Sequence, residues 1–341
     1  MQQIALKFRT IEPATPRLAP ARTRNPAGLF ISREVAEMYP YPKEFLSVDQ
    51  LVQKLIDSGI EASSRTEAIQ ALTTIGYYRL KGYGLQWLDP VSGKYKAGTS
   101  LTDILRLYHF DMELSRLLFQ YLSQIEVTLR ARLVNAFQAT QDALILNDPS
   151  AFEDKKLYWK NQGTIAGEIY RSSDVFIRHH FERYHGAVPL WAAVEVMSFG
   201  TLSKVVKNLK PGNGSVFSIL ARSYTFVGKK GGVVAPSKDL LTSWVQAATI
   251  MRNICAHNSR IYNRTISTRP ELLDMDRDWA KTQPKYNGLY QIMLAMKYLR
   301  PDDASWNAFV CEFQKLLNQY AGVYEFERMN FPGEWKKHFI V

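Results

Sequence analysis

The longest periodic stretch of the sequence runs from Leu101 to Phe137, and it limits the fold more than any other feature. Leucine and isoleucine recur in it at intervals of three and four residues, which is the repeat of one face of an α-helix. The pattern predicts one long helix. Arginines interrupt the stretch at Arg106, Arg116, Arg130 and Arg132.

Similar periodicity predicts further helices within residues 47–60, 66–88, 188–209, 288–299 and 306–320. Signals for strands are few, and we find no internal repeat. Hydrophobic residues make up 46% of the chain and charged residues 22%, as in a globular protein with an ample core. We therefore expect a mainly α fold.

The chain is strongly basic, with a formal net charge of +11 and a sequence pI near 9.4. Such an excess attracts polyanions, and nucleic acid is the commonest polyanion in a cell. Residues 1–30 alternate arginines with prolines, which prevent a regular helix or a central strand. We predict an extended basic arm over residues 1–40, with a frayed terminus as the alternative.

Other classes of protein receive little support from the sequence. Cys255 and Cys311 are too few for a disulfide framework or a cysteine-based zinc site, which favours a reducing cytosol. No apolar run approaches the roughly 20 residues of a membrane span, and the N-terminus lacks the apolar stretch of a signal peptide. Phosphate-loop and H-E-x-x-H motifs are lacking. We expect a cytoplasmic protein without a membrane, metal or cofactor requirement.

Residues 240–264, taken as one α-helix, are apolar around most of the circumference. An otherwise apolar helix with an unbroken polar strip faces a groove, a partner subunit or water on that side. The strip offers groups suited to phosphate binding and proton transfer, although it could also be the solvent side of an ordinary amphipathic helix. Arg252 can reach its edge. The strip comprises Thr242, Gln246, Thr249, Asn253, His257, Arg260 and Arg264.

Two acids, Glu126 and Glu195, stand alone in apolar helical stretches. A buried carboxylate requires a partner. We expect each to meet an arginine, with Arg130 or Arg252 as candidates, in a supporting role.

An aromatic and basic segment precedes the long helix. Its tyrosines could stack nucleobases beside phosphate-binding cations, or they could wedge between helices with their hydroxyls satisfied. The segment contains Tyr77, Tyr78, Arg79, Lys81, Tyr83 and Trp87.

The sequence R-N-I-C-A-H at residues 252–257 resembles the R-x4-6-H signature of the HEPN superfamily. Three segments before it, LTTIGYYRLKGY, FDMELSRLLFQYLSQIEVTLRARL and VPLWAAVEVMSFGTLSKV, occur in the order seen in the Abi-like abortive-infection proteins of bacteria, the AbiD/AbiF group. The resemblance covers roughly residues 42–300. The family is also similar to the HEPN ribonuclease parts of type VI CRISPR effectors.

The resemblance implies an HEPN-like helical bundle that pairs two such motifs across a homodimer and cuts RNA without a metal. It implies Arg252 and His257 as the catalytic pair, with Asn253 at the polar position after the arginine. We place the HEPN-like domain at residues 101–265, between an N-terminal helical region at 41–100 and a C-terminal helical extension at 266–341.

The residue types fit RNA cleavage. The 2′-hydroxyl of RNA is the nucleophile, so the protein need supply only proton transfer and charge stabilisation, leaving a 2′,3′-cyclic phosphate. One histidine cannot easily be both acid and base, and a second copy of His257 from a symmetry-related subunit would remove that difficulty. Glu126, Glu195 and Asn253 would support the catalytic pair. We expect RNA contacts from Arg260, Arg264, Arg130, Arg79, Lys81, Lys229 and Lys230.

Three functions fit these observations. The first is an antiphage, toxin-like endoribonuclease that a partner restrains. The second is an RNA-binding protein that holds a structured non-coding RNA with little or no cleavage. The third is a helical scaffold whose polar strip is only a dimer contact.

Overall fold

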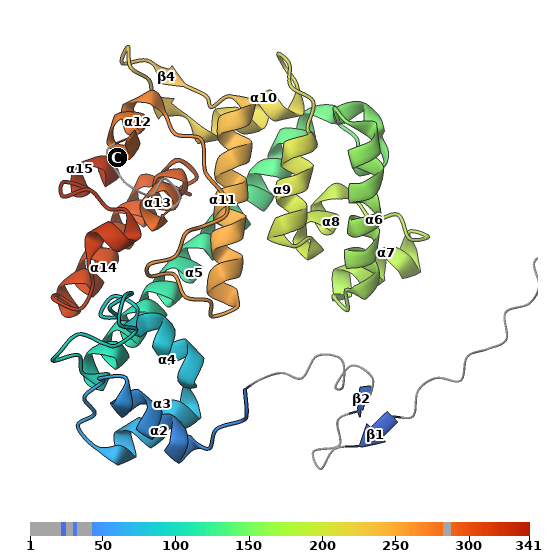
Figure 1. The fold of residues 1–341 in the computed structure, drawn as a ribbon. Helices are drawn as coiled ribbons and strands as arrows, with labels where there is room; N and C mark the ends of the chain where they lie inside the picture. The colour runs from blue at the N-terminus through green and yellow to red at the C-terminus, as the bar shows by residue number, and fades with distance from the viewer. Residues whose placement is uncertain (1–21, 25–29, 33–42, 282–287) are drawn as a thin grey trace, which may run out of the picture.

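A computed structural model describes residues 22–24, 30–32, 43–281 and 288–341. Its described part is mainly α, as predicted (Figure 1). The helices that matter for the site are α4 (Tyr77–Gly84), α5 (Leu101–Phe137), α8 (Leu190–Val196), α9 (Phe199–Asn208) and α11 (Lys238–Ala256). The others are α2 (Val48–Asp57), α3 (Arg65–Thr74), α6 (Lys155–Arg171), α7 (Val175–Arg183), α10 (Val216–Ala221), α12 (Asp274–Lys281), α13 (Leu289–Tyr298), α14 (Asp303–Gln319) and α15 (Lys336–Phe339).

The long helix α5 has the predicted bounds and forms the centre of the fold. Ser100 caps it by accepting a hydrogen bond from the amide of Asp103. Its apolar face is buried from Leu101 to Phe137. Helix α11 packs along α5 and also against α9 and α13, so that the two long helices meet in the core (Figure 1).

Helices α2, α3 and α4 form a small group at the N-terminal end of α5 (Figure 1). Ser47 caps α2 in a capping box with Gln50, which confirms the predicted helix start. Gly76, with φ +90°, makes the sharp turn from α3 into α4. The turn places Tyr77 and Tyr78 at the start of α4.

The remaining helices cover the other sides of the α5–α11 pair. Helices α6 to α9 lie together at one side, and α12 to α15 lie at the opposite side (Figure 1). Trp306 of α14 donates its indole N–H to the carbonyl of Phe339 in α15, which ties the C-terminal segment to the core. No described helix is long and apolar enough to cross a membrane.

Strands are short. β3 (Phe226–Val227) and β4 (Val233–Val234) form a hairpin before α11, and β1 (Arg22–Arg24) pairs antiparallel with β2 (Phe30–Ser32). The rest of the predicted arm, residues 1–40, lies outside the described residues.

The predicted helix over residues 240–264 is wrong at its C-terminal end, because α11 stops at Ala256. Residues after it form a loop that folds back over α5. The buried side chains of Ile261 and Tyr262 continue the apolar pattern from this loop. Their burial imitates the periodicity of a longer helix.

Candidate active site

The C-terminal end of α11 is closed by a Schellman motif. Asn258 adopts a left-handed conformation with φ +48°, and its amide donates to the carbonyl of Cys255 at 2.9 Å. The amide of Ser259 donates to the carbonyl of Ile254 at 3.0 Å. His257 is therefore the C-cap residue, and its position is fixed by backbone hydrogen bonds.

One helical turn before this end, Arg252 is bound to the buried acid Glu126 of α5. Its Nε donates to Glu126 Oε2 at 3.0 Å, and its Nη2 lies 2.9 Å from the same oxygen. The guanidinium carbon lies 5.7 Å from the ring centre of Phe199 in α9. Glu126 and Arg252 side chains are 11% and 21% exposed, so the pair is largely removed from water.

Glu126 also binds Arg130, one turn along α5. Arg130 Nη2 lies 2.7 Å from Glu126 Oε1, so each carboxylate oxygen meets a different arginine. The same guanidinium donates to the carbonyls of Val194 at 3.0 Å and Met197 at 2.7 Å, at the α8–α9 junction. The expectation that Glu126 meets an arginine is confirmed with both candidates.

Asn253 contacts Arg252 rather than the histidine. Its side-chain carbonyl accepts from Arg252 Nη1 at 3.0 Å. A guanidinium has five N–H groups, and Glu126 and Asn253 are the hydrogen-bond acceptors of Arg252 among the described residues. His257 is exposed, and its imidazole has no hydrogen-bond partner among the described residues.

A second buried acid on α5, Asp111, holds the loop that follows α11. It accepts hydrogen bonds from the amides of Ile261 and Tyr262, the latter at 2.6 Å, and from the hydroxyl of Tyr83 at 2.7 Å. Burial raises the pKa of Asp111, while these donors act in the opposite direction. The acid fixes the chain on the far side of His257.

Comparison with family models matches residues 70–263 to the family described as Abi-like protein. The match covers more than half of the chain and contains Glu126, Arg252 and His257. The chain belongs to the Abi-like protein family. Membership indicates a role in abortive infection, a defence response. Comparisons with curated proteins and with solved structures gave no match.

The other predicted residues of this Abi-like protein are spread over the fold. Arg260 donates to the carbonyl of Gly82 in α4, and Arg264 is exposed and donates to the carbonyl of Arg260 at 3.3 Å. Neither lies on α11, so their predicted alignment with His257 on one helix face is wrong. The predicted strip is also interrupted, because Thr249 is buried and donates to the carbonyl of Val245.

Four other residues that the sequence analysis assigned to the site lie in surroundings that differ from those expected. Glu195 is exposed and has no ion-pair partner among the described residues, so its predicted pairing is wrong. Lys229 lies 3.3 Å from Asp274 and sits with the exposed Lys230 in the β3–β4 turn. That turn precedes α11, at the opposite end of the helix from His257 (Figure 1). Arg130 is committed to internal contacts.

A pocket of about 510 Å³ lies beside the end of α11 and contains residues that the sequence analysis did not assign to a site. Asn258 and Ala256 line one side, and α5 contributes His109, Arg116 and Phe119. His109 and Arg116 are seven residues apart and so share one face of α5. This seven-residue spacing is the sequence signal that could have grouped His109 with Arg116. The pocket brings an imidazole and a guanidinium close to the candidate catalytic end.

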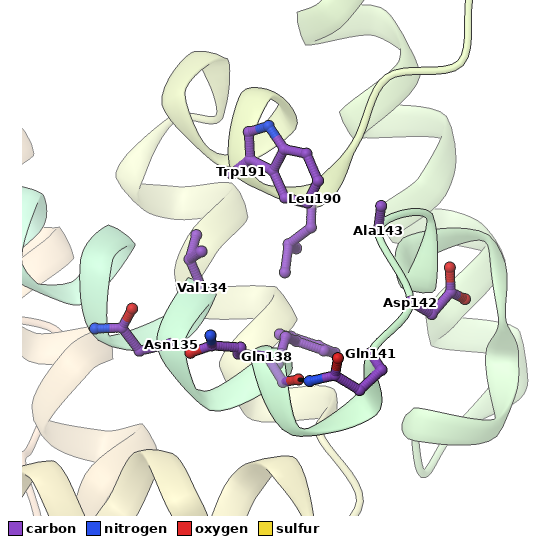
Figure 2. Close-up of a pocket in the computed structure, with 9 residues that line it drawn as sticks. Val134, Asn135, Gln138, Gln141, Asp142, Ala143, Leu190 and Trp191 are labelled. Carbon is purple, nitrogen blue, oxygen red and sulfur yellow. Dashed lines mark hydrogen bonds between the residues drawn. The ribbon is translucent and has the colours of Figure 1, made fainter.

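Another pocket, of about 490 Å³, opens at the C-terminal end of α5. In Figure 2, Leu190 and Trp191 face Val134 and the segment that carries Gln138 and Gln141. Its polar groups are amides and the carboxylate of Asp142, and none of the described residues that line it is a lysine or arginine. It is less suited to a phosphate chain than the pocket beside α11. Among the described residues, no group of three or more His, Cys, Asp or Glu is arranged to hold a metal ion.

Proposed function

We propose that this Abi-like protein is an endoribonuclease of defence, with Arg252 and His257 as its catalytic residues. The observation that carries the proposal is their arrangement at one helix end. Glu126 and Asn253 hold Arg252, no other described residue accepts a hydrogen bond from its guanidinium, and His257 is exposed at the C-cap five residues further along.

The chemistry follows from the two groups. The guanidinium would bind the non-bridging oxygens of the scissile phosphate and stabilise the charge that develops there. An imidazole has one nitrogen that can accept a proton and one that can donate one, so His257 can take the proton of the 2′-hydroxyl or give one to the leaving 5′-oxygen. The expected product is a 2′,3′-cyclic phosphate, without a metal requirement.

The reaction needs a second proton carrier. We propose that His257 of a second copy supplies it in a homodimer, because a two-fold axis beside this exposed helix end brings two equivalent imidazoles together. His109, in the pocket next to the end of α11, is a candidate for the same task within one chain.

A second function is RNA binding without cleavage. It is favoured by the internal commitment of both arginines to Glu126 and by the lack of an orienting partner for His257 among the described residues. In that case the protein would hold a structured RNA, and Arg252 would be a structural residue.

Replacing His257 by alanine separates the two functions. End-labelled RNA should be cut by the wild-type protein in EDTA, and His257→Ala should slow cleavage about 10²- to 10⁴-fold while keeping RNA affinity. His179→Ala, at another exposed histidine on helix α7, is the matched control and should cut normally. Equal cleavage by His257→Ala and wild type would rule out the catalytic role. Tight binding without any cleavage by the wild type would favour the second function.

A further inference from the structure

The largest of the pockets described here, about 700 Å³, lies among α2, α3, α4 and the segment before α2. Its lining includes Phe45, Tyr77 and Tyr78 together with the cations Lys43 and Lys54. The pocket is separate from the candidate active site, and none of the chemistry proposed above uses it.

Aromatic rings in this pocket are available to a ligand. Phe45 is fully exposed, and Tyr78 is 77% exposed. Tyr77 and Tyr78 meet edge to face, with ring centres 5.6 Å apart, and this contact helps to orient the ring of Tyr78. A large aromatic side chain left in water at such exposure offers a face on which a planar group can stack.

The charges around these rings favour an anion. Lys54 Nζ lies 5.4 Å from the ring centre of Tyr77, and Lys43 also lines the pocket, against the single acid Glu44. Arg79 and Lys81 follow on α4. Exposed aromatic faces among cations are the arrangement that binds single-stranded nucleic acid, because bases stack while phosphates pair with the cations.

Tyr83, the third tyrosine of α4, differs from Tyr78 and is not available for stacking on a ligand. Tyr83 is buried and donates to Asp111, so it serves as a wedge between helices. Tyr78 lies on the same short helix α4 and stays in solvent. The two interpretations of the segment therefore apply to different residues.

We infer that this pocket binds an unpaired nucleobase of an RNA, with its neighbouring phosphates on Lys54 and Lys43. The inference rests on the proposed function, since it adds a contact for the same RNA. Helix α4 lies next to the loop after His257, where Arg260 donates to the carbonyl of Gly82. A strand held at the pocket would approach the motif from the α4 side, and single-stranded RNA would be preferred to duplex.

The test uses the full-length protein with His257→Ala, which keeps the RNA intact during measurement. The probe is a single-stranded 12-nucleotide RNA that contains 2-aminopurine. Tyr78→Ala and Phe45→Ala should each weaken binding about tenfold and remove fluorescence quenching, because stacking on one aromatic ring is lost. Tyr78→Phe should bind like the parent. Tyr170→Ala, at an exposed tyrosine of α6, is the matched control and should also be unchanged.

Charge is tested separately. Lys54→Gln should reduce the slope of log affinity against log salt by about 0.7, the value for one phosphate contact on a single strand. Both aromatic positions are exposed, so melting temperatures should be unaffected.

The outcomes separate this inference from the proposed nuclease. Cleavage that depends on His257, with affinity unchanged in Tyr78→Ala and Phe45→Ala, overturns the inference alone. Binding that depends on Tyr78, without cleavage by the wild type, supports the inference and overturns the nuclease. A change of oligomeric state in Tyr78→Ala with unchanged RNA affinity would assign the pocket to protein association, and a protein that binds no RNA overturns both.

Discussion

Helix α5 carries two buried acids that act on the two sides of the R-x4-H motif in different ways. Glu126 binds charged side chains, Arg252 and Arg130. Asp111 binds neutral donors, which are two backbone amides of the loop after α11 and the hydroxyl of Tyr83. Glu126 positions the guanidinium of Arg252, and Asp111 positions the backbone of the loop that follows His257.

The two acids hold Arg252 and His257 to different degrees. Arg252 needs a fixed guanidinium, and an ion pair removed from water provides it. The backbone of His257 is held at the C-cap while its imidazole lies in solvent, an arrangement that suits the proposed proton transfer. The first arrangement is costly to break, and the second depends on several weaker hydrogen bonds.

Removing the carboxylate of Glu126, which binds Arg130 and Arg252, should have the largest effect on stability. Glu126→Ala leaves two largely buried guanidinium groups without a counter-charge, so we expect a loss of about 3–5 kcal/mol in the free energy of unfolding. Chemical denaturation measures it. Glu195→Ala, at an exposed glutamate, should cost less than about 0.5 kcal/mol. Similar losses for the two variants would contradict the central role of Glu126.

Weakening the hydrogen bonds of Asp111 should lower the free energy of unfolding by a smaller amount. Asp111→Asn keeps the shape but presents an amide to backbone donors, so about 1–3 kcal/mol should be lost. Tyr83→Phe removes one donor and should cost about 1 kcal/mol. If Asp111→Asn is as damaging as Glu126→Ala, then the contrast between the two acids is wrong.

The helix end itself gives a smaller effect. Asn258→Ala should cost about 1 kcal/mol, because alanine does not tolerate the left-handed conformation as asparagine does. Asn258→Gly should be nearly neutral. Urea melts of the two variants test this, and equal losses would mean that the conformation at residue 258 is not what ends α11.

Cys255 reports how tightly this end is closed. Burial raises the pKa of its thiol to about 11, so at pH 7.5 it should react with iodoacetamide far more slowly than the exposed Cys311. Asp111→Asn should accelerate its modification more than Glu126→Gln does. Peptide mass spectrometry follows both cysteines, and equal rates in the wild type would contradict the closed end.

Much of this arrangement could be predicted from the sequence. The bounds of α5 followed from its periodicity, and the pairing of Glu126 with Arg130 and Arg252 followed from the cost of an unpaired buried charge. The interpretation of Glu195 failed for a specific reason. Its helix, α8, exposes the residue, and periodicity does not tell which side of a short helix is covered.

The end of α11 was predictable in principle. Asparagine tolerates the left-handed conformation at a helix terminus, so Asn258 could have marked the end of α11. Ile261 lies at a spacing that continues the apolar pattern, and the predicted helix was therefore extended past Asn258. Its burial depends on the contact of the loop with Asp111, which lies 150 residues away in sequence. The positions of Lys229 and Lys230 at the other end of α11, and the pocket formed by His109, likewise depend on tertiary packing.

Arg130 links the catalytic candidate to a distant part of the chain. Its guanidinium joins Glu126 to two carbonyls at the α8–α9 junction, so the junction and Arg252 share one rigid connection. A protein or RNA that displaces this junction would reposition Arg252, the proposed phosphate-binding group, without covering it. If the proposed nuclease activity is restrained in the cell, an inhibitor could then act at the α8–α9 junction without occupying the proposed active site.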